Sequence, residues 1–361
     1  MVFVFALTQV TGFLSDHPTW IGMLQAAALL TVPWSSWASY SWLTNAVPAE
    51  DVISARLVIF CAMAAMFVAS LAVPGAFGHY GVIFGSAYFV VWLLQVLLYA
   101  LATGSDPEQR RAVLRLAPGL VVGPALLIVA GFLDGLAQGA LWAVALAVGY
   151  GVAFVRSVSG FRVHAGHFAE RHGLVVIIAL GESIVAAGVG ASGVGLGTSV
   201  LVAAVLGIVL AAALWWAYFD LVMLTAERRL SAAQEGEERV RLARDTYSYL
   251  HLPMVAGIIF IALGLKQTLA HVGEPLGMIP GIALCGGVAL YLLGHNAFRL
   301  RDEGSVSVPR LVVTILCCVL ILVAVSVPSL TTLAILTLLL CALAAFETAT
   351  SREFRRELRG R

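Results

Sequence analysis

One carboxylate, Glu182, lies inside a long apolar run and is the residue from which chemistry is most readily expected. The run from Arg171 to Gly188 is long enough to cross a bilayer, and Glu182 falls near its middle. A charge at that depth costs about 3 kcal/mol on insertion scales, so such residues usually have a partner, a water path or a function. Glu182 is therefore either a proton or cation site, an anchor for a polar substrate group, or a structural carboxylate held by a neighbouring helix. We expect a functional role.

Further polar residues are expected near one end of the same helices. Asp220 comes one turn after Trp216, His251 lies near the start of a later apolar run, and His295 lies near the end of the next. With Arg171, these side chains would line a polar inner vestibule beneath Glu182. The alternative is that each is an ordinary helix-end residue that caps the helix or extends to the membrane surface. Their concentration on one side favours the vestibule.

The elements that carry these residues must be membrane helices. Hydrophobic residues make up 61% of the 361 residues and charged residues only 11%, which is incompatible with a soluble domain. The net charge of +1 argues against nucleic acid as a partner. Apolar runs and breakers predict an all-α, polytopic transmembrane bundle of about twelve helices, with spans near 1–15, 19–44, 53–76, 80–103, 112–133, 138–156, 172–190, 196–224, 247–270, 278–300, 309–328 and 329–349. The last two could instead form one long helix.

Basic residues test this topology. All twenty arginines lie on the side that is reached after an even-numbered span, and Lys266 is the single basic residue on the other side. This alternation predicts a multi-pass protein of the inner (plasma) membrane with both termini cytoplasmic. The segment 227–245 alternates acids and arginines at helical spacing, which predicts a solvated cytoplasmic helix. Gln95 and Glu347 lie within spans and are expected to make helix contacts.

A weak internal similarity suggests two parallel six-helix repeats. Residues 2–10 align with residues 175–183, and a Trp- and Ser-rich segment at 34–40 aligns with 215–220. We therefore expect a first half at 1–160, whose first helix looks truncated, a second half at 161–350, and a basic cytoplasmic tail at 351–361. In such repeats the pathway lies at the repeat interface, and Gln9 would be the counterpart of Glu182. The expected pathway then comprises Glu182, Ser183, Asp220, His251, His295, Arg171 and Gln9.

Three blocks of the sequence resemble a known family. The segment from Phe168 to Gly173, continuing into Ile177–Ile184, resembles the signature of the bacterial low-temperature-requirement A (LtrA) family. The segments Trp215–Asp220 and Tyr249–Gly257 are similar to two further blocks of it. Members usually open with an acidic first helix, of which this chain keeps only the tail, so the first-half site differs from the family pattern. The resemblance implies a polytopic membrane protein associated by name with growth in the cold, and implies no activity.

The sequence contains no catalytic signature that would compete with transport. It has no Gly-x-Ser-x-Gly motif, no phosphate-binding glycine loop and no His-Glu-x-x-His motif. We therefore expect a transporter or channel-like permease for an ion or small polar solute, with the lipid bilayer as its other partner, and not an enzyme; we expect no metal and no cofactor. Two alternatives remain open: a non-transporting scaffold or cold-adaptation factor, and an intramembrane enzyme acting on lipid. The oligomeric state is left open.

Overall fold

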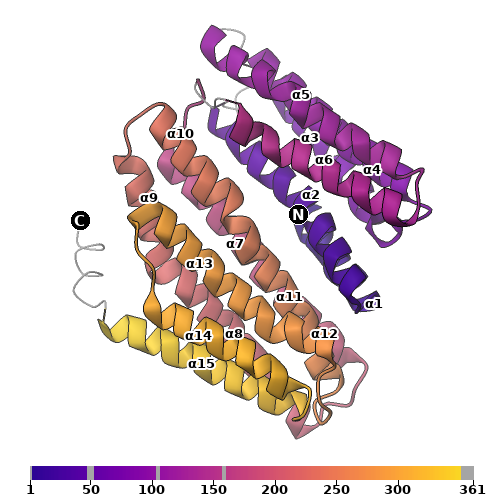
Figure 1. Ribbon diagram of the computed structural model, residues 1–361, viewed down its shortest axis with the longest axis vertical. Coiled ribbons are helices and arrows are strands. Elements are labelled where there is room, and N and C mark those ends of the chain that lie inside the picture. The colour runs from indigo at the N-terminus through magenta and orange to yellow at the C-terminus, as the bar shows by residue number, and fades with distance from the viewer. Residues whose placement is uncertain (1, 47–52, 103–105, 157–159, 351–361) are drawn as a thin grey trace. The chain divides into compact units, whose positions relative to one another are not determined.

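The computed structural model describes residues 2–46, 53–102, 106–156 and 160–350 (Figure 1). The expected basic tail at 351–361 lies outside these described residues. In the part of the chain described, all regular elements are helices, apart from an isolated bridge between Pro275 and Pro328. They are α1 (Val2–Asp16), α2 (Trp20–Ala46), α3 (Ile53–Ala72), η1 (Val73–Gly75), α4 (Gly81–Ala102), α5 (Pro107–Ala130), α6 (Gly135–Val155), α7 (Ala165–Ser192), α8 (Thr198–Ala217), η2 (Tyr218–Val222), α9 (Met223–Ala232), α10 (Glu237–Ala243), η3 (Arg244–Tyr249), α11 (His251–Ala270), α12 (Met278–Gly281), η4 (Ile282–Gly286), α13 (Gly287–Glu303), α14 (Val308–Ala324) and α15 (Ser329–Thr350).

These elements form the helical bundle that the sequence predicts. Three of the long helices are continuous through π-helical segments, so η2 joins α8 to α9, η3 joins α10 to α11, and η4 joins α12 to α13. Counted in this way, the described residues contain twelve long helical stretches, which confirms the expected number. Nine of the described stretches are long and apolar enough to cross a membrane by length and composition, and Val2–Asp16 and Val308–Ala324 are shorter apolar helices.

The last apolar region is a hairpin of two helices. α14 ends at Ala324 and α15 begins at Ser329, as the helix-hairpin alternative predicts. The turn is held by backbone bonds from Leu276 N to the Ala324 carbonyl (3.1 Å) and from Ser329 N to the Glu274 carbonyl (2.8 Å). A single long helix across this region is therefore wrong.

The segment 227–245 is not the one helix that its charge spacing predicts. Its first part, α9, continues from α8, and its second part, α10, leads through η3 into α11. The break between them is at Gly236, whose φ of +100° no other residue adopts easily. The helical charge spacing persists on both sides, because Arg239 pairs with Glu235 and Arg241 with Glu237. Charge spacing predicts helix but not where one helix ends.

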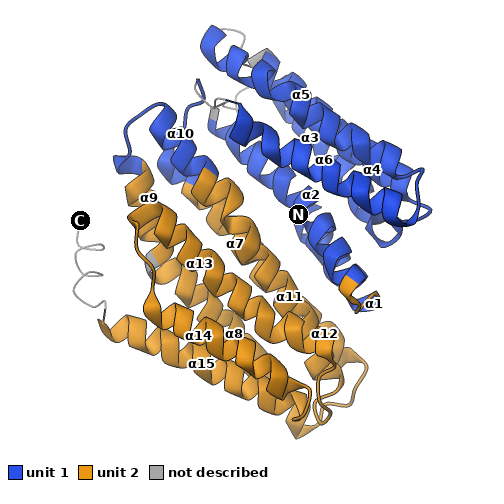
Figure 2. Cartoon of the chain, in the orientation of Figure 1, with its two compact units in different colours: residues 1–16, 21–168, 231–244 blue, residues 17–20, 169–230, 245–361 orange. Residues whose placement is uncertain are grey.

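The chain divides into two compact units (Figure 2). Unit 1 comprises residues 1–16, 21–168 and 231–244, and within it α3 packs on α4, α4 on α5 and α5 on α6. Unit 2 comprises residues 17–20, 169–230 and 245–361, and within it α11 packs on α13, α13 on α14 and α8 on α15. The two six-helix repeats and their boundary at residue 160 remain predictions.

Candidate functional site

Glu182 lies on the buried face of α7. Only 2% of the residue is exposed, and Ala179 and Ser183 beside it are fully buried. The opposite face of α7 carries exposed apolar side chains, including Ile177 (47%) and Ile184 (46%). Glu182 therefore points away from the face that suits lipid. The Ser183 hydroxyl donates to the Leu180 carbonyl at 2.7 Å, so its proton is used within its own helix.

His251 is held on both of its ring nitrogens. Its Nδ1 lies 2.9 Å from the Thr246 carbonyl, and its Nε2 lies 2.8 Å from the Tyr218 hydroxyl. Because a carbonyl only accepts, Nδ1 carries the proton and Nε2 accepts from Tyr218. The ring is also stacked on Tyr247, with centroids 5.1 Å apart and an interplanar angle of 13°, and lies 5.4 Å from the ring of His172. Burial and these contacts fix a neutral imidazole in one orientation.

Two π-helical segments position this histidine. Tyr218 opens η2, and Tyr247 and the Thr246 carbonyl belong to η3. A π-helical turn contains one more residue than an α-helical turn, so it shifts the phase of every following side chain, and such segments recur at functional sites. In unit 2 they turn Tyr218 and Tyr247 toward His251.

His295 is bonded to a buried ion pair. The Arg310 guanidinium donates to both carboxylate oxygens of Glu347, at 2.7 and 2.8 Å, and to the Ala217 carbonyl at 3.1 Å. Its remaining terminal nitrogen lies 2.6 Å from Nδ1 of His295. Because a guanidinium cannot accept, Nδ1 of His295 is the acceptor and Nε2 carries the proton. The pair is shielded, with 8% and 18% of the two side chains exposed.

These two groups meet through Tyr218. The Tyr218 ring lies edge-on to both His251 (5.6 Å) and His295 (6.0 Å), and the Tyr291 ring lies 4.4 Å from His295. The Tyr291 hydroxyl donates to the Leu214 carbonyl at 2.8 Å. We call this group the His–Tyr–Arg cluster; its members are Tyr218, His251, Tyr291, His295, Arg310 and Glu347. Glu347 is half-buried and the other five residues are buried, and the one positive and one negative charge of the cluster cancel.

The structure thus joins some of the predicted site residues and separates others. His251 and His295 both contact the Tyr218 ring. Asp220 is buried in η2 two residues after Tyr218, and Arg171 is half-buried in α7. Gln9 lies half-buried in α1 of unit 1, and its correspondence with Glu182 remains a prediction.

Glu182 lies at another level from the cluster. His172, whose ring contacts His251, precedes Glu182 by ten residues on α7, which corresponds to about 15 Å along a helix. His251 and Arg310 lie near the starts of α11 and α14, Tyr218 directly follows α8, and Glu347 lies near the end of α15. Tyr291 and His295 lie in the first half of α13 and at its middle. The carboxylate and the cluster are therefore successive layers along the helices of unit 2.

Sequence reasoning missed the Arg310–Glu347 pair. In the sequence, Arg310 serves only as one of the arginines that indicate the topology, and Glu347 is expected to make helix contacts. Arg310 falls two residues inside the apolar helix α14, and Glu347 falls inside α15. A basic and an acidic residue within different membrane spans are the signal that would have predicted the pair. Tyr218, Tyr247 and Tyr291 carry no comparable signal, because tyrosine is common in apolar helices.

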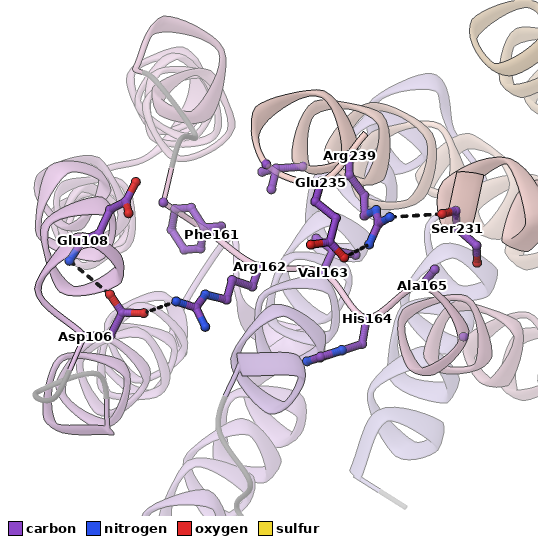
Figure 3. A pocket seen from close by; sticks show the side chains of 14 residues that line it. Asp106, Glu108, Phe161, Arg162, Val163, His164, Ala165, Ser231, Glu235 and Arg239 are labelled. Carbon is purple, nitrogen blue, oxygen red and sulfur yellow. Dashed lines mark hydrogen bonds and ion pairs between the residues drawn. The ribbon is translucent and has the colours of Figure 1, made fainter. Parts of the chain in front are cut away.

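A separate pocket lies in unit 1 (Figure 3). It has a volume of about 640 Å³ and is formed by the start of α5, the segment 160–166 and the turn around Gly236. Its arginines are paired, Arg162 with Asp106 at 2.9 Å and Arg239 with Glu235 at 3.2 Å. None of the expected pathway residues lines it. Among the residues that the structure describes, no group of three His, Cys, Asp or Glu side chains is arranged to hold a metal ion.

Removing the Tyr218 hydroxyl should destabilise the protein. In Tyr218→Phe, Nε2 of the fully buried His251 loses its donor, and an unsatisfied buried acceptor costs about 1–3 kcal/mol. We expect a lower midpoint of thermal unfolding in detergent. Tyr80→Phe, at an exposed tyrosine near the start of α4, is the control and should leave the midpoint unchanged. Equal midpoints for both variants would refute the assigned hydrogen bond.

A family model described as bacterial low temperature requirement A protein (LtrA) matches residues 1–345. An uncharacterized protein of Rhizobium meliloti (strain 1021), RA0937, is 31% identical over 309 residues, which cover 81% of this chain and 73% of that protein. No solved structure matches the chain.

Proposed function

We propose that this chain, which belongs to the bacterial low temperature requirement A family, is a transporter or channel-like permease in which Glu182 binds the permeating ion or polar solute. The chain is a polytopic membrane protein of that family. The observation that carries the proposal is the carboxylate of Glu182, buried in the middle of a long apolar helix and facing away from the exposed apolar side. We further propose an inner-membrane location with both termini in the cytoplasm, from the arginine alternation.

The chemistry of the site favours a proton or a cation as the cargo. An ionised carboxylate offers two oxygen acceptors and a negative charge, and a protonated one offers a single donor. Such residues inside membrane proteins mark ion and proton pathways by default. The His–Tyr–Arg cluster carries no net charge, so Glu182 rather than the cluster is proposed to select the charge of the cargo.

Transport is favoured over lipid chemistry by the state of His251. An acid–base catalyst needs a ring nitrogen that can reach a substrate. Both nitrogens of His251 are engaged, one by the Thr246 carbonyl and one by the Tyr218 hydroxyl. This engagement supports a positioning role for the histidine and leaves Glu182 as the group proposed to act.

Flux through proteoliposomes tests the proposal. Vesicles loaded with a dye that reports H⁺, Na⁺ or K⁺ would be given a gradient of that cation, and wild-type flux would be compared with that of protein-free vesicles. We expect flux of at least one of these cations, and a loss of about tenfold or more in Glu182→Gln, because the variant keeps the shape but not the charge. Asp134→Asn, the same change at an exposed residue before α6, is the control.

The outcomes separate transport from a structural role. A non-transporting scaffold predicts no flux in the wild type and a lower unfolding midpoint in Glu182→Gln. Flux that is equal in wild type and Glu182→Gln would remove the carboxylate from the pathway. Either result contradicts the proposed function.

A further inference from the structure

The pocket of unit 1 has walls that are held in place by bonds within the protein (Figure 3). The ion pair between Arg162 and Asp106, at 2.9 Å, ties the segment 160–166 to the start of α5. The same segment is held by Asn45, whose side chain accepts from the backbone N–H of His164 at 2.8 Å and donates to its carbonyl at 3.2 Å. Two of the three segments that form the pocket are therefore anchored.

Arg239 holds the third segment, the turn between α9 and α10. Its Nε donates to the Ala233 carbonyl at 3.2 Å, and one terminal nitrogen donates to the carbonyls of Ser231 and Ala233, at 3.0 and 2.9 Å. The other terminal nitrogen donates to the Glu235 carboxylate at 3.2 Å. All three nitrogens of the guanidinium are thus engaged within the turn. A pocket whose walls are set before a ligand arrives loses less entropy on binding.

The side chains that line the pocket carry more negative than positive charge. In the two ion pairs, Arg162–Asp106 and Arg239–Glu235, the charges cancel. Glu108 adds a third carboxylate. Its bond in Figure 3 is made by the backbone nitrogen, which donates to Asp106, and not by the side chain. The lining therefore contains one carboxylate that no other lining residue neutralises.

The carboxylate of Glu108 determines which charge a ligand should carry. A Cβ on Gly160 would lie 3.2 Å from Cγ of Glu108, so this side chain runs against the segment 160–166 at the wall of the pocket. An anion would have to compete with Asp106 and Glu235 for the arginines. A cation can bind Glu108 without breaking a bond, because both carboxylate oxygens accept hydrogen bonds. The lining thus favours a cation that donates hydrogen bonds.

The pocket also has an apolar side, formed by Phe161, Val163 and Val240. The Phe161 ring is half-buried and lies edge-on to Trp42 and Tyr99, with centroids 6.0 and 5.9 Å away. An aromatic face attracts an ammonium group, and apolar side chains favour contact with a hydrocarbon chain. A volume of about 640 Å³ lies in the range of sites for small organic molecules. Charge, apolar surface and size together suit an organic cation.

We propose that this pocket binds a linear aliphatic amine with two or more ammonium groups. One ammonium group pairs with Glu108, and a second pairs with the Glu235 oxygen that does not bond to Arg239. The methylene chain between them lies along Phe161. Figure 3 shows Glu108 and Glu235 on opposite sides of Phe161, which is the arrangement that charges at both ends of a chain require. The inference is independent of the proposed function, because none of the expected pathway residues lines the pocket.

Calorimetric titration of the purified protein with spermidine, in a nonionic detergent at low ionic strength, tests the site. We expect saturable binding that weakens as salt is added, because salt screens exposed charges. Glu108→Gln should bind about fivefold more weakly, which is the upper range for one exposed ion pair. Glu238→Gln is the matched control, because Glu238 is also exposed but does not line the pocket, and it should bind like the wild type. Both variants should elute like the wild type on size-exclusion chromatography.

Three further titrants define the class of ligand. Butane-1,4-diol and succinate carry hydroxyls or carboxylates in place of the ammonium groups, and neither should bind. Mg²⁺ carries charge without a chain and should bind more weakly than spermidine. Absence of spermidine binding, or equal affinity in wild type and Glu108→Gln, overturns the proposal. Mg²⁺ that binds as tightly as spermidine also overturns it, because charge alone would then account for the binding, and so does succinate that binds.

Discussion

Truncating Glu347 should be the most destabilising single change in unit 2. In Glu347→Ala the Arg310 guanidinium loses both bonds to the carboxylate and keeps only the Ala217 carbonyl and His295 as acceptors. An uncompensated buried charge costs about 3–5 kcal/mol. We expect a large drop in the unfolding midpoint in detergent, with a smaller fraction of monodisperse protein on size-exclusion chromatography.

Two controls isolate the buried charge as the cause. Glu303→Ala breaks the exposed Arg299–Glu303 pair, which is worth about 0–1 kcal/mol, so its midpoint should be nearly that of the wild type. The double variant Arg310→Met/Glu347→Met removes both charges at similar volume and should recover much of the lost stability. A double variant as unstable as Glu347→Ala would mean that packing, and not the unpaired charge, sets the effect.

The ion pair also determines the state of His295. Because Arg310 donates to Nδ1, the proton of the neutral ring is held on Nε2, and the imidazole cannot take a second proton at Nδ1 without losing this bond. His251 has the opposite arrangement, with its proton on Nδ1. Within the cluster, His251 therefore accepts a hydrogen bond at Nε2 and His295 accepts one at Nδ1, although both are neutral histidines.

The helical bundle was predictable because two independent signals agree. Apolar run lengths locate the helices, and the arginines all lie on one side when the loops are counted in order. A missed or extra helix would have moved some arginines to the other side. The ends of α8 and α11 were not predictable from either signal. The charged residues from Glu227 to Asp245 are compatible with one helix between two membrane spans and also with extensions of those two spans. The break between the two extensions depends on one residue, Gly236.

The candidate site was predictable only where a polar residue interrupts an apolar run. Glu182 meets that condition, and it is buried on α7. The tyrosine partners of His251 were not found, because Tyr218 and Tyr247 reach it through π-helical turns. A π-helical turn leaves no mark in hydropathy or charge, since it depends on how neighbouring helices pack.

Gly257 should be nearly as sensitive as Glu347, for a steric reason. α11 and α13 cross with their backbones in contact, and a Cβ on Gly257 would lie 2.5 Å from the Gly287 carbonyl oxygen and 2.9 Å from the Tyr291 backbone nitrogen. Neither atom can rotate away, so Gly257→Ala must push the helices apart. We expect a loss of about 3 kcal/mol, at the upper end of what overpacking by one methyl group costs.

The displacement should also reach the His–Tyr–Arg cluster. α11 carries His251, and α13 carries Tyr291 and His295, so separating these helices changes the distances within the cluster. Gly139→Ala, on α6 with open space around the new Cβ, is the control and should not lower the midpoint, because alanine favours helix over glycine. If Gly257→Ala behaves like Gly139→Ala, α11 and α13 are not in backbone contact. Gly257→Ala can also be compared with Tyr218→Phe in the flux assay. A loss of both stability and cation flux in Gly257→Ala, with a loss of stability alone in Tyr218→Phe, would show that flux depends on the spacing of α11 and α13 more than on the Tyr218–His251 bond.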